Sequence, residues 1–191
     1  MAIGNLGKAL QDLGRIDEAI AAYHAAIAWD PDNAVIQANL GAALLEKRAW
    51  EDAADATQRA IALKADNALA YGNLGIALLN LRRYDEALVA CRQAMSLKPQ
   101  NATVHASLGG AMLELGAFQE AEPLCRQAIA LDPAAIAWFN LSHALKALNQ
   151  LEEAATAAHQ AIAICPQSAG YHFHLAHILP LQGNLDAGWL E

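Results

Sequence analysis

The sequence predicts an all-α protein built from stacked pairs of antiparallel helices, an α-solenoid. The main observation is a seven-residue phrase, GNLGKAL at its first occurrence, which recurs with variation from residues 4, 38, 72, 106, 139 and 173. The steps between these starts are 34, 34, 34, 33 and 34 residues, a spacing typical of helical repeats. One such unit cannot bury its own apolar face, so neighbouring units are expected to stack.

Each phrase is predicted to lie in the first helix of a unit. In the third unit, Tyr71, Leu74, Gly75 and Leu78 fall on one stripe of a helical wheel, which is the expected buried face. A small residue is needed on this stripe where two helices touch, because a larger one would overpack the contact. The small residues are Gly7, Gly41, Gly75, Gly109, Ser142 and Ala176.

A tight turn is predicted after each first helix. Glycine or asparagine at its central position suits a left-handed helix C-cap. Arg48 and Arg82 occupy this position in the second and third units, so these two turns are expected to close differently. The residues that fit the pattern are Gly14, Gly116, Asn149 and Gly183.

The second helix of each unit follows a large apolar residue, and most begin with acidic residues such as Asp17 and Glu18. Carboxylates in a first turn favour the positive end of the helix dipole. Alanines at two recurring positions allow close approach of helix backbones, and a proline ends most units because it cannot continue a helix. These prolines are Pro31, Pro99, Pro133 and Pro166.

The leucine, glycine, alanine and proline positions at this period resemble the tetratricopeptide repeat over nearly the whole chain. The resemblance implies a right-handed α-solenoid in one array, with a non-catalytic role as a scaffold for protein–protein interaction. About five full repeats and a truncated sixth are expected, at approximately residues 1–33, 34–67, 68–101, 102–134, 135–168 and 169–191. Because both ends look uncapped, we expect part of a longer protein, or self-association through the terminal repeats.

Asparagine recurs beside the leucine of the phrase, although it forms helix less readily than alanine by several tenths of a kcal/mol. Asn73 falls roughly 150° from the centre of the buried stripe, which places it on the concave wall expected for the first helices. A row of carboxamides there could pair with the backbone of an extended peptide. The alternative is that the asparagines hydrogen-bond to a neighbouring helix. The row consists of Asn5, Asn39, Asn73, Ser107, Asn140 and His174.

The row is similar to the asparagine ladder in the tetratricopeptide superhelix of O-linked N-acetylglucosamine transferase, which implies binding of protein substrates. The segment GNLDAGW resembles the end of bacterial repeat arrays that a glycosyltransferase-type domain follows. Three hypotheses remain: a scaffold that binds a peptide or protein, the substrate-recognition arm of a larger glycosyltransferase, or a self-assembling structural array. For the first, Ile76, His143 and His177 join the row as predicted binding residues.

Other chemistry has weaker support in the sequence. His143, His174 and His177 could converge on a zinc ion, but no carboxylate or thiol with clear ligand spacing joins them, and a polar concave wall explains them equally well. Cys91 and Cys125, at the repeat position of Tyr23, are interpreted as small core residues. No catalytic triad, carboxylate pair or phosphate loop stands out, so we predict no catalytic residue, cofactor or metal.

The composition narrows the class of partner. The 191-residue chain has a formal net charge of -8, which disfavours binding to nucleic acid or to anionic membranes. No apolar run approaches the roughly 18 residues that a membrane span needs. Three cysteines without a CxxC motif indicate a reduced compartment, and a cytoplasmic location is expected. A protein or peptide is therefore the expected partner.

Overall fold

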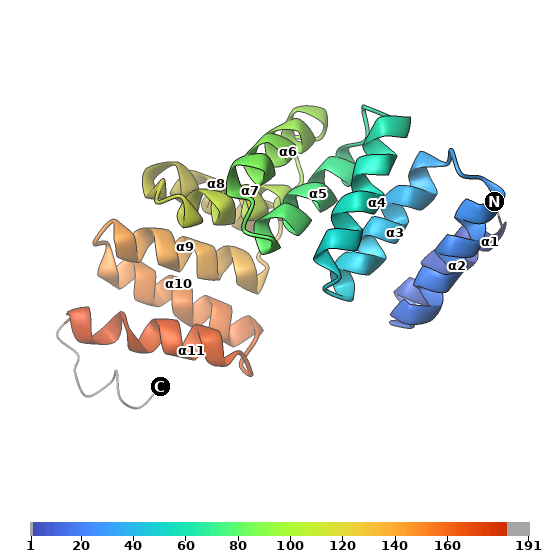
Figure 1. Ribbon diagram of the computed structural model, residues 1–191. Helices are drawn as coiled ribbons and strands as arrows, with labels where there is room; N and C mark the ends of the chain where they lie inside the picture. Colours follow the sequence, from blue (N-terminus) through green and yellow to red (C-terminus); the bar gives the residue numbers. More distant parts are fainter. Residues whose placement is uncertain (1, 183–191) are drawn as a thin grey trace. The chain divides into compact units, whose positions relative to one another are not determined.

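The computed structural model describes residues 2–182, which form helices joined by short connections (Figure 1). This part of the chain holds eleven α-helices and one 3-10 helix and no strand, which confirms the all-α prediction. The predicted turn residue Gly183 and the GNLDAGW segment lie outside the described residues. The helices are α1 (Ala2–Asp12), α2 (Ile16–Trp29), α3 (Ala34–Glu46), α4 (Trp50–Leu63), α5 (Ala68–Asn80), α6 (Tyr84–Leu97), α7 (Ala102–Glu114), α8 (Phe118–Leu131), α9 (Ala135–Ala147), α10 (Leu151–Ile164), α11 (Ala169–Ala176) and the 3-10 helix η1 (Leu179–Gln182).

The chain divides into two compact units, an N-terminal unit Met1–Pro99 and a C-terminal unit Gln100–Glu191. Within each unit, the first helices α1, α3, α5, α7 and α9 each pack on the second helix of their own repeat, and that second helix packs on the next first helix of the unit. First helices of successive repeats also contact each other, α3 with α5 in the N-terminal unit and α7 with α9 in the C-terminal unit. This consecutive pairing is that of the predicted solenoid.

A glycine in the middle of the first helix lets the second helix approach closely. A Cβ added to Gly75 would lie 2.4 Å from Cys91 Sγ, and one added to Gly41 would lie 2.5 Å from Thr57 Cγ2. Real Cβ atoms do not tolerate such contacts, so the second helix fills the space that the glycine leaves. The prediction that a small residue is needed where the two helices touch follows directly from these distances.

The fifth repeat exchanges the sizes of the two partners. Ser142 on α9 stands where the earlier repeats carry glycine, and Ala158 on α10 stands at the repeat position of Thr57 and Cys91. Ser142 is fully buried, and its hydroxyl donates a 2.7 Å hydrogen bond to the carbonyl of Ala154. A small partner on the second helix therefore accompanies the larger residue on the first helix.

All five described turns between first and second helices close in the same way. Their central residues have φ between 60° and 74°, including Arg48 and Arg82 at 61°, so the prediction that the arginine turns differ was wrong. In the second repeat the amide of Arg48 donates to Leu45 O at 3.0 Å and that of Ala49 to Leu44 O at 2.9 Å, a Schellman motif. Pairing of these carbonyls fixes the turn, so arginine adopts a conformation that L residues rarely take.

The connection between repeats determines how the next first helix begins. Asn33, Asn67 and Asn101 cap α3, α5 and α7, and each side chain accepts a hydrogen bond from the backbone amide three residues later. The 33-residue step removes one residue from the connection before α9, and Ala134 then occupies the N-cap position without a side-chain acceptor. α9 therefore lacks the asparagine cap that stabilises the preceding first helices.

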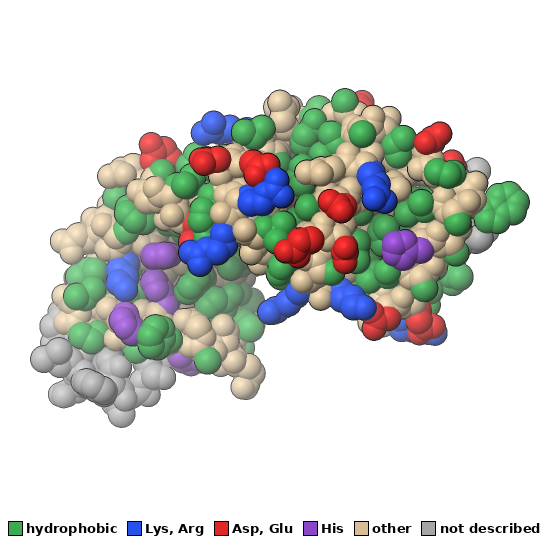
Figure 2. Space-filling view, viewed as in Figure 1, with side chains coloured by type: hydrophobic (Ala, Val, Ile, Leu, Met, Phe, Trp, Pro, Cys, Tyr) green, Lys and Arg blue, Asp and Glu red, His purple; other side chains and the backbone are tan. Residues whose placement is uncertain are grey.

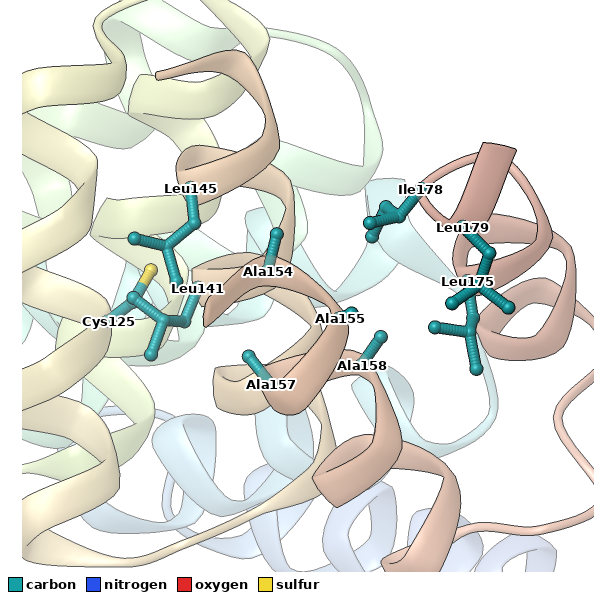
Figure 3. Close-up of a cluster of buried hydrophobic side chains, with 10 residues drawn as sticks. All are labelled: Cys125, Leu141, Leu145, Ala154, Ala155, Ala157, Ala158, Leu175, Ile178 and Leu179. Carbon is teal, nitrogen blue, oxygen red and sulfur yellow. The ribbon is translucent and has the colours of Figure 1, made fainter. Parts of the chain in front are cut away.

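A buried cluster in the C-terminal unit holds α11 in place (Figure 3). Leu175 and Ile178 are fully buried and belong to the same cluster as Ala155 and Ala158 of α10. Because the alanine side chains of α10 are small, the large side chains that follow α10 in sequence can approach its backbone closely. This packing fixes the last described first helix, which carries His174 and is followed directly by His177.

Candidate functional site

Asn73, on α5 of the N-terminal unit, is the first asparagine of the row whose side chain is hydrogen-bonded to another helix, an arrangement that we call tethered. Asn73 is only 8% exposed, and its Nδ2 donates to the carbonyl of Ala38 on α3 at 3.4 Å. Asn73 is therefore mostly buried, although the helical wheel places it opposite the buried stripe. The helical wheel took account only of packing within one helix pair, whereas α5 also packs on α3 and α4 of the preceding repeat.

The same arrangement recurs in the C-terminal unit, on α9. Asn140 is 8% exposed, and its Nδ2 donates to the carbonyl of Ala106 on α7 at 3.1 Å. Ser107 is buried as well, but its hydroxyl donates within α7 to the carbonyl of Thr103 at 2.8 Å. The alternative in which asparagine bonds to a neighbouring helix is thus correct for Asn73 and Asn140.

The two earlier asparagines are more accessible. Asn5 on α1 is exposed and Asn39 on α3 is half-buried, and the side chains of both form no hydrogen bond within residues 2–182. Neither carboxamide is held by a hydrogen bond to the described part of the chain. The row is therefore mixed, with two accessible carboxamides, two that are tethered, and Ser107 bonded within its own helix.

Apolar side chains lie beside the tethered carboxamides on the first turns of the same helices. Leu69 on α5 and Ile136 on α9 are 48% and 50% exposed, each four residues before the asparagine of its helix. Residues four apart share one face of a helix. Ile76, a predicted binding residue, is half-buried three residues after Asn73. The face therefore combines amide groups with aliphatic side chains.

His174 on α11 ends the row with a different tether. Its Nε2 lies 3.1 Å from the hydroxyl of Ser142, and that hydroxyl donates its own proton to Ala154. Nε2 of His174 must therefore carry the hydrogen and donate it, which leaves Nδ1 as an acceptor in the neutral ring. Burial is the main cause that lowers the pKa of His174 to about 4, and the positive charge of Lys146 acts in the same direction.

Aromatic rings surround His174. Its ring centroid lies 5.1 Å from that of Phe139 and 5.6 Å from that of His143, while Phe139 also contacts Tyr171 at 4.9 Å. Burial and the charge of Lys146 lower the pKa of His143 as well. Because the pKa of each is lowered, the imidazoles of His143 and His174 are neutral near pH 7. Figure 2 shows histidine side chains gathered on one face over α9 to α11, with a basic side chain beside them.

The predicted histidines come together only in part. His143 and His174 are neighbours, whereas the ring of His177 packs on Phe173 at 4.3 Å and its Nδ1 lies 2.8 Å from the Phe173 carbonyl. Among the described residues, no group of three or more histidine, cysteine, aspartate or glutamate side chains could hold a metal ion. Phe139, which is close to these histidines in the sequence, contacts His174, and Tyr171 contacts Phe139.

The two cysteines at the Tyr23 position are core residues, as predicted. Cys91 and Cys125 are fully buried, and burial raises the pKa of each thiol to about 12. Such thiols stay protonated and unreactive near neutral pH. Across residues 2–182, every helix is too short or too polar to cross a membrane.

Family models of the tetratricopeptide repeat match residues 7–48, 68–101 and 135–168. A search of curated proteins found no match. Solved structures include a thermophilic TPR protein of Thermus thermophilus, with a TM-score of 0.73, 22% identity, and coverage of 94% of this chain and 98% of that one. YrrB, described as a TPR protein with an unusual peptide-binding site, has a TM-score of 0.68 and 22% identity, covering 93% and 90%. PilW, a type IV pilus biogenesis factor, has a TM-score of 0.84 and 19% identity, covering 98% and 88%.

Proposed function

Because the chain belongs to the tetratricopeptide repeat family, we propose that it is a protein-interaction scaffold that binds an extended peptide or protein segment along the face of its first helices. The observation that carries the proposal is the tether that recurs in both units. Asn73 and Asn140 each donate one hydrogen to a carbonyl of the preceding first helix. Each carboxamide keeps a second N–H and its oxygen for a ligand.

Tethering favours binding because it fixes the orientation of the carboxamide before the ligand arrives. A side chain that is already ordered loses less conformational entropy when it binds. An extended peptide offers alternating N–H and C=O groups, and a carboxamide can pair with both kinds. The exposed Leu69 and Ile136 add apolar contact on the same helices. Recognition would then depend mainly on the peptide backbone, with moderate selection of side chains.

The proposed binding residues are those predicted from the sequence, namely Asn5, Asn39, Asn73, Ser107, Asn140, His174, Ile76, His143 and His177. The peptide-binding site of the structural neighbour YrrB supports a role of this kind for the fold. The same face would serve a substrate-recognition arm of a larger glycosyltransferase, because such an arm also holds protein segments.

Self-association is a second candidate, favoured by an apolar face of α1. Leu6 is 53% exposed, whereas Leu40 and Leu74 at the same repeat position are 4% and 8% exposed because other helices cover them. Leu13, which follows the same helix, is 71% exposed. If a second copy covers this face, light scattering should show association that rises with concentration and is lost in Leu6→Ser. A monomer at all concentrations would rule this candidate out.

Selection from a random peptide library displayed on phage, followed by fluorescence anisotropy with the best peptide, tests the proposed binding. We expect the triple variant Asn39→Ala, Asn73→Ala, Asn140→Ala to bind at least about tenfold more weakly, because each lost hydrogen bond costs about 0.5–1.5 kcal/mol. The control is Thr156→Ala, an exposed residue of the second helix α10 whose hydroxyl donates within its own helix to the carbonyl of Glu152. It should retain affinity within about twofold.

The triple variant must also be compared in stability. Since Asn73 and Asn140 bond to the preceding first helix, their loss should lower the melting temperature. Affinity is therefore measured well below the melting temperature of the variant. Affinity within about twofold of wild type, together with lower stability, would show that the asparagines serve the fold alone. Failure to select any peptide would refute the proposal itself.

A further inference from the structure

The last two phrases of the chain differ from the first four in a coordinated way. FNLSHAL and FHLAHIL carry phenylalanine at the first position and histidine at the fifth, whereas the earlier phrases begin with glycine or alanine. Phe139 and His143 on α9 therefore stand at the same repeat positions as Phe173 and His177 at α11. The C-terminal unit thus holds two copies of one aromatic pair, one repeat apart.

The first pair is occupied by rings of the next helix. His174 of α11 contacts both members, Phe139 at 5.1 Å and His143 at 5.6 Å between ring centroids. Tyr171 of the same helix adds a contact with Phe139 at 4.9 Å. These separations lie in the range that aromatic pairs prefer. In the first pair, this combination of residues therefore packs against aromatic side chains of the next first helix.

The second pair is open. Phe173 is 68% exposed and His177 is exposed as well. In place of an incoming ring, the His177 imidazole packs on its own neighbour Phe173 at 4.3 Å, with Nδ1 2.8 Å from the Phe173 carbonyl. At the first pair, the incoming ring contacts both members instead. Within residues 2–182, only the first pair contacts a third ring, and this is the difference between the two copies.

We propose that Phe173 and His177 form a subsite for an aromatic side chain of a bound peptide segment, which contacts both rings as His174 contacts Phe139 and His143. The inference rests on the proposed function, because it names the residue type that the first-helix face selects at this position. Phenylalanine, tyrosine or tryptophan from a partner protein would fit the subsite.

The occupant of the first pair distinguishes this subsite from a site for a cationic side chain, which aromatic rings also attract. The ring that contacts Phe139 and His143 is the imidazole of His174, which is neutral near pH 7 because its pKa is lowered to about 4. Lys146 acts electrostatically on His143 and His174, and Glu114 acts on His143 in the opposite direction.

The test uses the full chain and the same random peptide library. Peptides selected on wild type should be enriched in aromatic residues over the unselected library. The best peptide should lose at least about tenfold in affinity for Phe173→Ala, and a similar factor when its aromatic residue is replaced by alanine. The two changes together should cost little more than one of them, because they remove the same contact. Val89→Ala, 63% exposed on α6, is the control and should bind normally.

Several results would overturn the inference. Selected peptides without aromatic enrichment, or enriched in lysine and arginine, would contradict the chemistry of the subsite. Association of the free chain that Phe173→Ala abolishes would assign the subsite to a second copy. Nuclear Overhauser contacts from Phe173 to residues other than His177 in the dilute chain would assign it to a segment of this chain.

The outcome also separates this inference from the proposed function. A peptide that loses affinity for the triple asparagine variant and binds Phe173→Ala within about twofold of wild type refutes the aromatic subsite alone. A library that yields no peptide refutes both.

Discussion

Replacing Gly75 by alanine tests the close packing of α5 on α6. The added Cβ would lie 2.4 Å from Cys91 Sγ, whereas the next nearest atoms, Cys91 N and Ala87 O, are 3.6 Å and 3.7 Å away. The conflict therefore involves a single sulfur atom. Cys91 is fully buried, so its side chain has little room to turn away. The change should force either the sulfur or one of the two helices to shift.

The magnitude follows from two opposing effects. Overpacking of a buried contact costs about 1–3 kcal/mol, and replacing glycine by alanine inside a helix returns about 1 kcal/mol. Gly75→Ala should then lose about 0–2 kcal/mol of unfolding free energy. Cys91→Ala alone should lose roughly 1 kcal/mol, as small buried deletions do. In the double variant the added methyl group has space, so its stability should be close to that of wild type.

Urea unfolding followed by far-ultraviolet circular dichroism measures the effect in the four proteins of this cycle. The coupling between the two positions should be about 1–3 kcal/mol in favour of the double variant. Gly109→Ala should be milder, because its added Cβ would lie 2.9 Å from Cys125 Sγ. Gly4→Ala is the control, since its nearest contact would be an ordinary 3.4 Å to Ile36, and it should not destabilise. If the double variant loses the sum of the two single losses, the steric explanation is wrong.

Three further changes test other features. Arg48→Gly should raise the unfolding free energy measured in urea by about 0.5–1 kcal/mol, because it removes the left-handed strain of an L residue. Arg82→Gly should gain less, because it also loses a hydrogen bond to Tyr84. No gain for Arg48→Gly would contradict the presence of this strain. A thiol reagent at mildly alkaline pH should modify exposed Cys165 first, whereas equal rates would contradict the raised pKa of the two buried cysteines. The pKa of His174, lowered to about 4 from 6.5, means that the unfolded chain binds more protons between these values. Stability should therefore fall as the pH decreases through this window, less so in His174→Asn, and equal urea midpoints on either side of the window would refute this.

The repeated helix pairs could be predicted from sequence because their contacts repeat at a fixed spacing. Gly75 and Cys91, or Gly41 and Thr57, meet within one hairpin, so the same small and large positions return in each unit. Local patterns of this kind identify both the elements and their partners. The recurring alanine and proline positions also predicted the length of the second helix and where it ends.

Two features could not be predicted, and both depend on structure beyond a single residue or helix. The preference for glycine at the centre of the turn gave the wrong expectation for Arg48. Hydrogen bonds from the amides of Arg48 and Ala49 to the last carbonyls of α3 fix the turn despite the strain. The helical wheel placed Asn73 opposite the buried stripe, because it did not include the packing of α5 on the preceding repeat.

The exchange of sizes in the fifth repeat has a consequence for how such a chain can be rearranged. Ser142 faces the position of Ala158, whereas Gly75 faces Cys91, so the first helix of one repeat does not fit the second helix of the other. A recombination event with its crossover inside a hairpin would combine serine with cysteine and create a steric conflict. A crossover in the connection between hairpins would keep each matched pair together. Exchanges that involve the fifth repeat should therefore be tolerated best when whole hairpins are exchanged.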